Sequence, residues 1–198
     1  GVLTDIGFRN VVEAQQVYGG HGYIAEHGME QFVRDARIAL IYEGANGIQA
    51  LDLVGRKLPK DGGRALMGFF GEIDDFLSEN KDDAALAPYL DGLKRGRDDL
   101  EKATQWLMAN ALAKPDNAGA GATDYMHLMG LVALGFMWAK KAKTAHTSLA
   151  VGGNRAWLEA KLVTGRYFME RIMPETAAHL ARISSGAETM MALDAEAF

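Results

Sequence analysis

Apolar residues recur every three or four positions along most of the chain, which is the spacing of an amphipathic helix. This spacing predicts a helix over residues 5–18, a second over residues 28–40 and a third over residues 45–58. The alternation and the two-residue turns that mark β-hairpins are absent from the sequence. We therefore predict an all-α chain.

A break interrupts the helical spacing at residues 59–63, where the sequence reads Pro-Lys-Asp-Gly-Gly. Proline and paired glycines end helices and favour turns. We place a domain boundary here, with residues 1–60 as one unit and residues 61–198 as the other. Short turns join most helices of the second unit, which favours an antiparallel helical bundle; these helices are residues 64–78, 91–112, 124–149 and a last long helix that ends at Pro174.

Three stretches of the second unit allow more specific predictions. The glycine-rich residues 114–122 are typical of a mobile linker. Asn154 follows a Gly-Gly pair and can cap the next helix. The apolar run 125–139 contains about fifteen residues, whereas a membrane span needs about twenty. We therefore interpret this run as a buried core helix and predict no membrane span.

Composition narrows the chemistry further. The formal net charge is −5, so the chain has no basic surplus with which to bind nucleic acid. The lack of cysteine excludes disulfides, thiolate catalysis and cysteine-based metal centres, and it fits a cytoplasmic location. The five histidines lack the spacing of metal ligands, so we predict no metal site. No signal peptide is visible. The chain starts without methionine, inside an expected helix, so we expect a piece of a longer protein.

Two motifs near the N-terminus are candidates for chemistry, residues 16–23 (QVYGGHGY) and residues 34–49 (RDARIALIYEGANGIQ). The glycines of the first motif close a helix, so they do not fit the dinucleotide-binding fingerprint and on spacing alone indicate a helix cap and turn. Glu43 follows the apolar run 38–42, which would partly desolvate its carboxylate and suit it to act as a general base. A solvated glutamate at a helix start has the same spacing, which leaves both interpretations open.

The two motifs together resemble the C-terminal segment of the acyl-CoA dehydrogenases, in which a QxxGGxGY turn precedes an RDAR-type helix and an IYEGT-like catalytic loop. The match extends from about Asp5 to Leu58. Residues 48–58, followed by a further helical region, resemble the long bacterial members, among them the 3-methylmercaptopropionyl-CoA dehydrogenases. The resemblance implies that the end of the dehydrogenase C-terminal helical domain is followed by an appended helical bundle.

The resemblance also implies roles for individual residues. Glu43 would remove the α-proton of an acyl-CoA while the β-hydrogen leaves as hydride to FAD, and its peptide N–H would help bind the thioester carbonyl. Tyr42 would line the acyl pocket, and Gly44 would let the backbone pass close to the thioester. Ala45 departs from the family, which usually has a hydroxyl residue there. The residues that match FAD-contacting positions are Gln16, Gly19, Gly20, Ala45, Asn46 and Gly47.

Further implications concern partners. The family's members act in fatty acid metabolism, pass electrons to electron-transfer flavoprotein, and form homo-oligomers in which a subunit often contacts the FAD of its neighbour. The family's N-terminal helical domain and middle β-domain have no counterpart here, so we expect the chain alone to be inactive. Two alternatives remain, a helical interaction or oligomerisation module without catalysis of its own, and a non-catalytic family member. Glu43 argues against the second.

Overall fold

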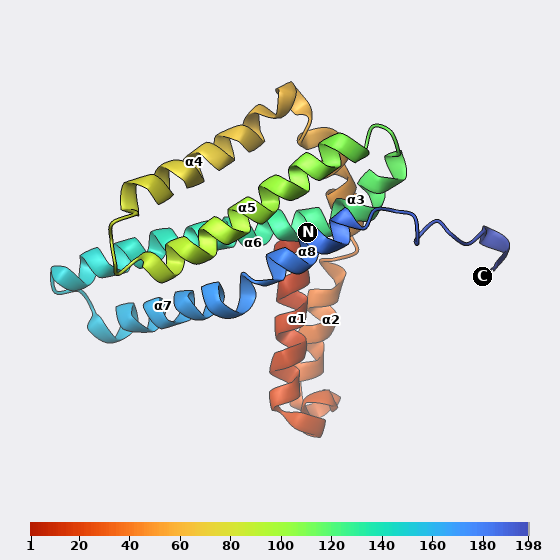
Figure 1. Cartoon of the computed structure of the whole chain (residues 1–198). Helices are drawn as coiled ribbons and strands as arrows, with labels where there is room; N and C mark the ends of the chain where they lie inside the picture. The colour runs from red at the N-terminus through yellow and green to blue at the C-terminus, as the bar shows by residue number, and fades with distance from the viewer. Residues whose placement is uncertain (198) are drawn as a thin grey trace.

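The computed structural model describes residues 1–197, and all the regular elements of this part of the chain are helical. The all-α prediction is therefore confirmed. Helices α1 (Val2–Val17) and α2 (Met29–Ile38) lie against each other and project from the rest of the molecule (Figure 1). The 3₁₀ turns η1 (Gly19–Tyr23) and η2 (Ala25–His27) join them at the far end. We call residues 2–38 the arm.

Helix α3 (Ala45–Asp52) returns the chain to the main body and continues into a π-helical turn, η3 (Leu53–Lys57). The expected helix over residues 45–58 is therefore present with a widened last turn. Its apolar side chains pack against the core of the main body, and those involved are Leu53, Val54 and Leu58. The 3₁₀ turn η4 (Lys60–Gly63) follows, and positive φ angles within it end the helical path.

Five helices form the rest of the chain, and we call them the appended bundle. They are α4 (Arg64–Asn80), α5 (Ala87–Asn110), α6 (Pro115–Ala150), α7 (Arg155–Tyr167) and α8 (Glu175–Ser184). Helix α6 is central, since it contacts α1, α3, α5, α7 and α8. Its buried face confirms the predicted core helix and includes Tyr125, Leu128, Val132 and Phe136. None of the described helices is long and apolar enough to cross a membrane.

Close helix approach in the bundle depends on glycines that face methionines. A Cβ atom on Gly135 of α6 would lie 2.8 Å from the sulfur of Met173, and one on Gly92 of α5 would lie 2.9 Å from the sulfur of Met169. Met169 belongs to the π-helical turn η5 (Phe168–Ile172), which follows α7. The missing side chains let α5 and α6 approach this turn, and the flexible thioethers fill the space between them.

The prediction of a mobile linker at residues 114–122 was wrong, because α6 begins at Pro115. Proline suits the first turn of a helix, where its missing N–H costs no hydrogen bond. Buried Asn117 then fixes the segment, since its Oδ1 accepts from the Ala187 N–H (3.0 Å) and its Nδ2 donates to the Asn110 carbonyl (3.3 Å). Gly121 is also buried, against Leu107 and Ile183. These tertiary contacts override the weak helix propensity of glycine.

The predictions for the C-terminal part of the chain are confirmed in part. Asn154 caps α7 as predicted, with its Oδ1 accepting from the Trp157 N–H (3.2 Å). The helical path through α7 and η5 also ends before Pro174. Helix α8, however, was not predicted from the sequence. It starts directly after Pro174 and packs on α5 and α6.

Candidate functional site

The loop between α2 and α3 has an unusual backbone. We call residues 39–44 the Glu43 loop. The φ angles are +54° at Glu43, +101° at Gly44 and +53° at Ala45, the first residue of α3. Residues other than glycine rarely adopt this left-handed conformation. Such strain costs on the order of 1–3 kcal/mol per residue and concentrates at functional sites.

Hydrogen bonds on both sides hold this backbone in place. The Asn46 N–H donates to the Leu40 carbonyl (3.1 Å), and the Ala45 N–H donates to the Tyr42 carbonyl (3.3 Å). The Gln49 side chain donates to the Glu43 carbonyl (3.4 Å). Within residues 1–197 the N–H of Glu43 itself donates no hydrogen bond. The loop therefore presents a free backbone donor beside the Glu43 carboxylate.

The Glu43 side chain is exposed, and so are its neighbours Ile41 (51% exposed) and Tyr42 (54%). The desolvation that the sequence suggested for Glu43 is therefore not supplied by residues 1–197. The apolar residues beside it do not cover it, because they are themselves turned toward the surface. Any apolar cover over this carboxylate has to come from another molecule or another part of the polypeptide.

Asn46 is turned toward α1 and away from the surface. Its Nδ2 lies within hydrogen-bond distance of the Gly1 carbonyl (3.1 Å), the Thr4 hydroxyl (2.9 Å) and Asp5 Oδ1 (2.8 Å). The side chain and the backbone N–H of Asn46 are therefore both engaged within the protein. Gly47 is exposed in the first turn of α3, with open space where a Cβ atom would stand.

The other predicted FAD contacts lie at the far end of the arm. Gln16 is at the end of α1, and Gly19 and Gly20 follow in η1; all three are exposed. Asn46 reaches α1 at Asp5, eleven residues before Gln16, which corresponds to about 16 Å along the helix axis. The predicted FAD contacts thus form two groups at opposite ends of the arm. One group is Ala45, Asn46 and Gly47, and the other is Gln16, Gly19 and Gly20.

The sequence pointed to Gln16 at this end of α1 and gave no signal for its neighbour Gln15. The Gln15 amide donates to the Gly22 carbonyl (3.0 Å) and so closes the turn. Gly22 is buried, and a Cβ atom there would lie 2.6 Å from the Gln15 carbonyl oxygen. The glycine-rich motif therefore has a structural requirement at Gly22, while Gly20 has open space around it.

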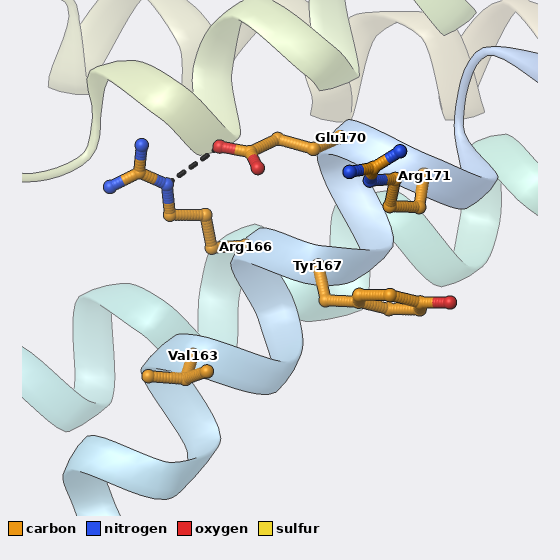
Figure 2. A pocket seen from close by; sticks show the side chains of 5 residues that line it. All are labelled: Val163, Arg166, Tyr167, Glu170 and Arg171. Carbon is orange, nitrogen blue, oxygen red and sulfur yellow. Dashed lines mark hydrogen bonds and ion pairs between the residues drawn. The ribbon is translucent and has the colours of Figure 1, made fainter.

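An open depression of about 460 Å³ lies elsewhere, on the surface of α7 and η5. One helical segment lines it, and Arg166 there pairs with Glu170 (2.6 Å; Figure 2). None of its lining residues belongs to the predicted site. Among the described residues, no group of three or more His, Cys, Asp or Glu side chains is arranged to hold a metal ion.

Comparison with known families matches two successive stretches of the chain. The family described as "Acyl-CoA dehydrogenase, C-terminal domain" matches residues 2–58. The family described as "Acetyl-CoA dehydrogenase C-terminal like" matches residues 69–194, which is more than half of the chain.

Individual relatives of the chain are also acyl-CoA dehydrogenases. The chain is 36% identical over 177 residues to 3-methylmercaptopropionyl-CoA dehydrogenase of Ruegeria pomeroyi, covering 89% of this chain and 30% of that protein. It is 26% identical over 207 residues to the broad-specificity linear acyl-CoA dehydrogenase FadE5 of Mycobacterium tuberculosis, covering 100% of this chain and 34% of that protein. The chain thus spans about a third of the length of these curated relatives. By these matches, and with an all-helical fold to accompany them, the chain belongs to the acyl-CoA dehydrogenase family.

Proposed function

We propose that this chain supplies the catalytic base and part of the FAD-contacting surface of an enzyme that introduces an α,β double bond into an acyl-CoA thioester. The observation that carries the proposal is the left-handed backbone of the Glu43 loop, which places an exposed carboxylate beside a free N–H. That loop lies within the residues that match the dehydrogenase C-terminal domain. The relatives named above are acyl-CoA dehydrogenases.

The reaction requires a proton acceptor and a hydrogen-bond donor from this loop. The Glu43 carboxylate would accept the α-proton, and the Glu43 N–H would donate to the thioester carbonyl and stabilise the negative charge that develops there. Gly44 has no side chain to obstruct the thioester, and exposed Tyr42 would face the acyl chain. Because Glu43 is exposed here, the bound substrate and the rest of the enzyme would have to exclude water from it.

The residues present fit a dinucleotide at two places. Exposed Gly47, in the first turn of α3, leaves room for a negatively charged group at a helix N-terminus. Gln16, Gly19 and Gly20 offer a second exposed surface. A bound FAD would supply the acceptor for the hydride that leaves the β-carbon. Asn46 would support this surface without donating to the cofactor, because its side chain is engaged by α1 and its N–H by the Leu40 carbonyl.

The separation of the two surfaces along the arm supports a homo-oligomer. One surface lies beside Glu43, and the other lies at the far end of α1. The two would then serve the flavins of two subunits, with electron-transfer flavoprotein as the acceptor of electrons.

One observation favours a different function, a helical interaction module without catalysis. The arm leaves large apolar side chains partly exposed, namely Val12, Ile24, Phe32 and Ile38. Such a surface suits contact with other helices. A purely structural module would not need Glu43 for its role, so substitution of this residue separates the two functions.

The decisive test is Glu43→Gln in the complete polypeptide that contains this chain. Glutamine keeps the size of the side chain and cannot accept the proton, so flavin and acyl-CoA should still bind. The rate of flavin reduction should fall by at least about 10²–10⁴-fold, the usual contribution of a general base. Stopped-flow absorbance at the flavin band measures this rate, and a titration gives substrate affinity, which should change little.

Glu26→Gln and Glu30→Gln provide matched controls, since both residues lie before the Glu43 loop in the arm. These two variants should reduce flavin within a few-fold of the wild-type rate. If Glu43→Gln also reduced flavin at nearly the wild-type rate, the base would have to be another residue and the proposal would be wrong.

A further inference from the structure

A chain of polar side chains connects the Glu43 loop to the appended bundle. Asn46 Nδ2, three residues after Glu43, donates to Asp5 Oδ1 (2.8 Å). The other carboxylate oxygen of Asp5 pairs with His127 Nε2 (2.9 Å). Asp5 belongs to α1 and His127 to α6. A single carboxylate therefore joins the first turn of α3 to the central helix of the bundle.

A second pair supports the first. His179 Nδ1 of α8 lies 2.6 Å from Asp124 Oδ1 of α6, one helical turn before His127. The two imidazole rings stack, with centroids 5.8 Å apart and planes 13° apart. Arg182 also approaches Asp124 (3.3 Å). Stacking on His179 limits the rotation of the His127 ring and so keeps its Nε2 directed at Asp5.

These groups are shielded enough to keep a defined geometry. The side chains of Asp5 and His127 are 26% and 17% exposed, and those of Asp124 and His179 are 21% and 13% exposed. An ionised carboxylate only accepts hydrogen bonds, so His127 Nε2 and Asn46 Nδ2 both donate to Asp5. Hydrogen bonds to a charged acceptor are shorter and stronger than those between neutral groups.

Asn46 in turn restrains the Glu43 loop. Its N–H bonds the Leu40 carbonyl across the loop (3.1 Å). Its side chain is held by the first turn of α1. Glu43, Gly44 and Ala45, which have positive φ angles, lie between Leu40 and Asn46. A shift of Asn46 would therefore move the backbone that positions Glu43.

We infer that His127 and Asp5 are positioning residues, through which the appended bundle fixes Asn46 and the Glu43 loop in the geometry for proton abstraction. This inference rests on the proposed function, because it assigns the bundle a part in the reaction without contact to substrate.

The test separates the hydrogen bond from the ring stacking at position 127. His127→Phe keeps a ring against His179 and removes the donor to Asp5. His127→Gln keeps a donor close to the position of Nε2 and removes the ring. In the complete enzyme, His127→Phe should slow flavin reduction by about 10- to 100-fold, as expected when a catalytic group is misplaced by about 1 Å. KM should change less than threefold, and His127→Gln should restore the rate to within about threefold of wild type.

A structural readout accompanies the kinetics and does not depend on the proposed function. In this chain labelled with ¹⁵N, the side-chain amide signals of Asn46 should shift in His127→Phe, and the Asn46 backbone N–H should exchange faster. Asp5→Asn is a near-isosteric second variant. It replaces one carboxylate oxygen by an NH₂ group, which cannot accept a hydrogen bond from Asn46 or His127, so it should behave like His127→Phe. Arg182→Ala touches only the Asp124 end and should leave Asn46 unchanged.

The outcomes are distinct. Unchanged Asn46 signals in both His127→Phe and Asp5→Asn would overturn the inference. So would a shift of Asn46 without any loss of reduction rate, or a loss that His127→Gln failed to restore. If Glu43 proved not to be the base, the proposed function would fail, while the Asn46 signals would still report whether the bundle holds this residue.

Discussion

At the scale of single residues, Tyr125 shows how burial changes the chemistry of a side chain. Tyr125 lies in the first third of α6 and is fully buried. Its hydroxyl has one polar partner, the Thr104 hydroxyl of α5 at 2.7 Å. Burial raises the pKa of Tyr125 from 10.0 to about 12, because the tyrosinate would lose its hydration in the core.

The sign of the resulting pH dependence follows from linkage. Unfolded Tyr125 ionises near pH 10, whereas in the folded state its pKa lies near 12. The unfolded state therefore loses its proton first, and stability that is present below pH 10 is lost as the pH rises to 12. The loss approaches about 2.7 kcal/mol, which is two pKa units at about 1.36 kcal/mol each.

Tyr125→Phe should remove this contribution to the pH dependence, at a cost of about 0.5–1.5 kcal/mol at neutral pH for the lost hydrogen bond. Urea unfolding at pH 8, 10 and 11 measures both effects. Tyr18→Phe is the control, because Tyr18 is 55% exposed. Equal slopes against pH in wild type and Tyr125→Phe would contradict the assignment.

The sequence revealed only part of the site at this scale. Tyr42, Glu43 and Gly44 could be selected because they are adjacent in the chain and belong to one motif. The orientation of Asn46 toward α1 could not, since it depends on Thr4 and Asp5, about forty residues earlier. The pairing of Asp5 with His127 spans 122 residues and leaves no local signal.

At the scale of helices, apolar spacing predicted α1 to α7 because apolar residues recur every three or four positions along each of them. The two failures, the start of α6 and the whole of α8, have a common physical reason. Both are stabilised by contacts distant in sequence, namely the hydrogen bond of Asn117 with Ala187 for the start of α6, and packing on α5 and α6 for α8. Glycines at 119 and 121 suggested a flexible segment, and only the tertiary contacts show that it is helical.

Gly119→Ala tests whether the segment that starts at Pro115 is helical. Gly119 lies in α6, is exposed, and has no atom within 4 Å of a Cβ position. Alanine should therefore stabilise the folded chain by about 0.5–1 kcal/mol, because it reduces the entropy of the unfolded state. Gly152→Ala is a matched control with equal space but a φ of +85°, and it should destabilise. Chemical denaturation measures both, and no effect of Gly119→Ala would favour a mobile linker.

At the scale of the whole molecule, the helices on the two sides of residues 59–63 share apolar contacts. Ala50 of α3 is fully buried against Ala122 and Met126 of α6. The arm, in contrast, projects from the bundle (Figure 1) and contributes no residue to its main core. Several of its large apolar side chains are exposed. Sequence spacing located the break, and the packing of α3 on α6 could not be foreseen from it.

We predict that residues 62–198 fold without the rest of the chain. The buried residues of the main core lie between Leu66 and Ile183, so they all remain when residues 1–61 are removed, although Leu53, Val54 and Leu58 then no longer pack against them. The removal uncovers Met126, which is 7% exposed in the whole chain. Full burial of one such side chain contributes about 1.5–3 kcal/mol, so the free energy of unfolding should fall by at least about that amount.

Residues 1–60 make the informative comparison, because Ala50 is the one buried apolar residue that the structure describes in them. Without α6 to cover α3, this segment has too little apolar burial to offset the entropy of ordering its backbone. Far-UV circular dichroism during urea titration should therefore show a cooperative transition for residues 62–198, at a lower midpoint than for the whole chain, and none for residues 1–60. A bundle that melted without cooperativity would mean that α3 and the arm are required to form its core, and the boundary at residues 59–63 would not divide independent domains.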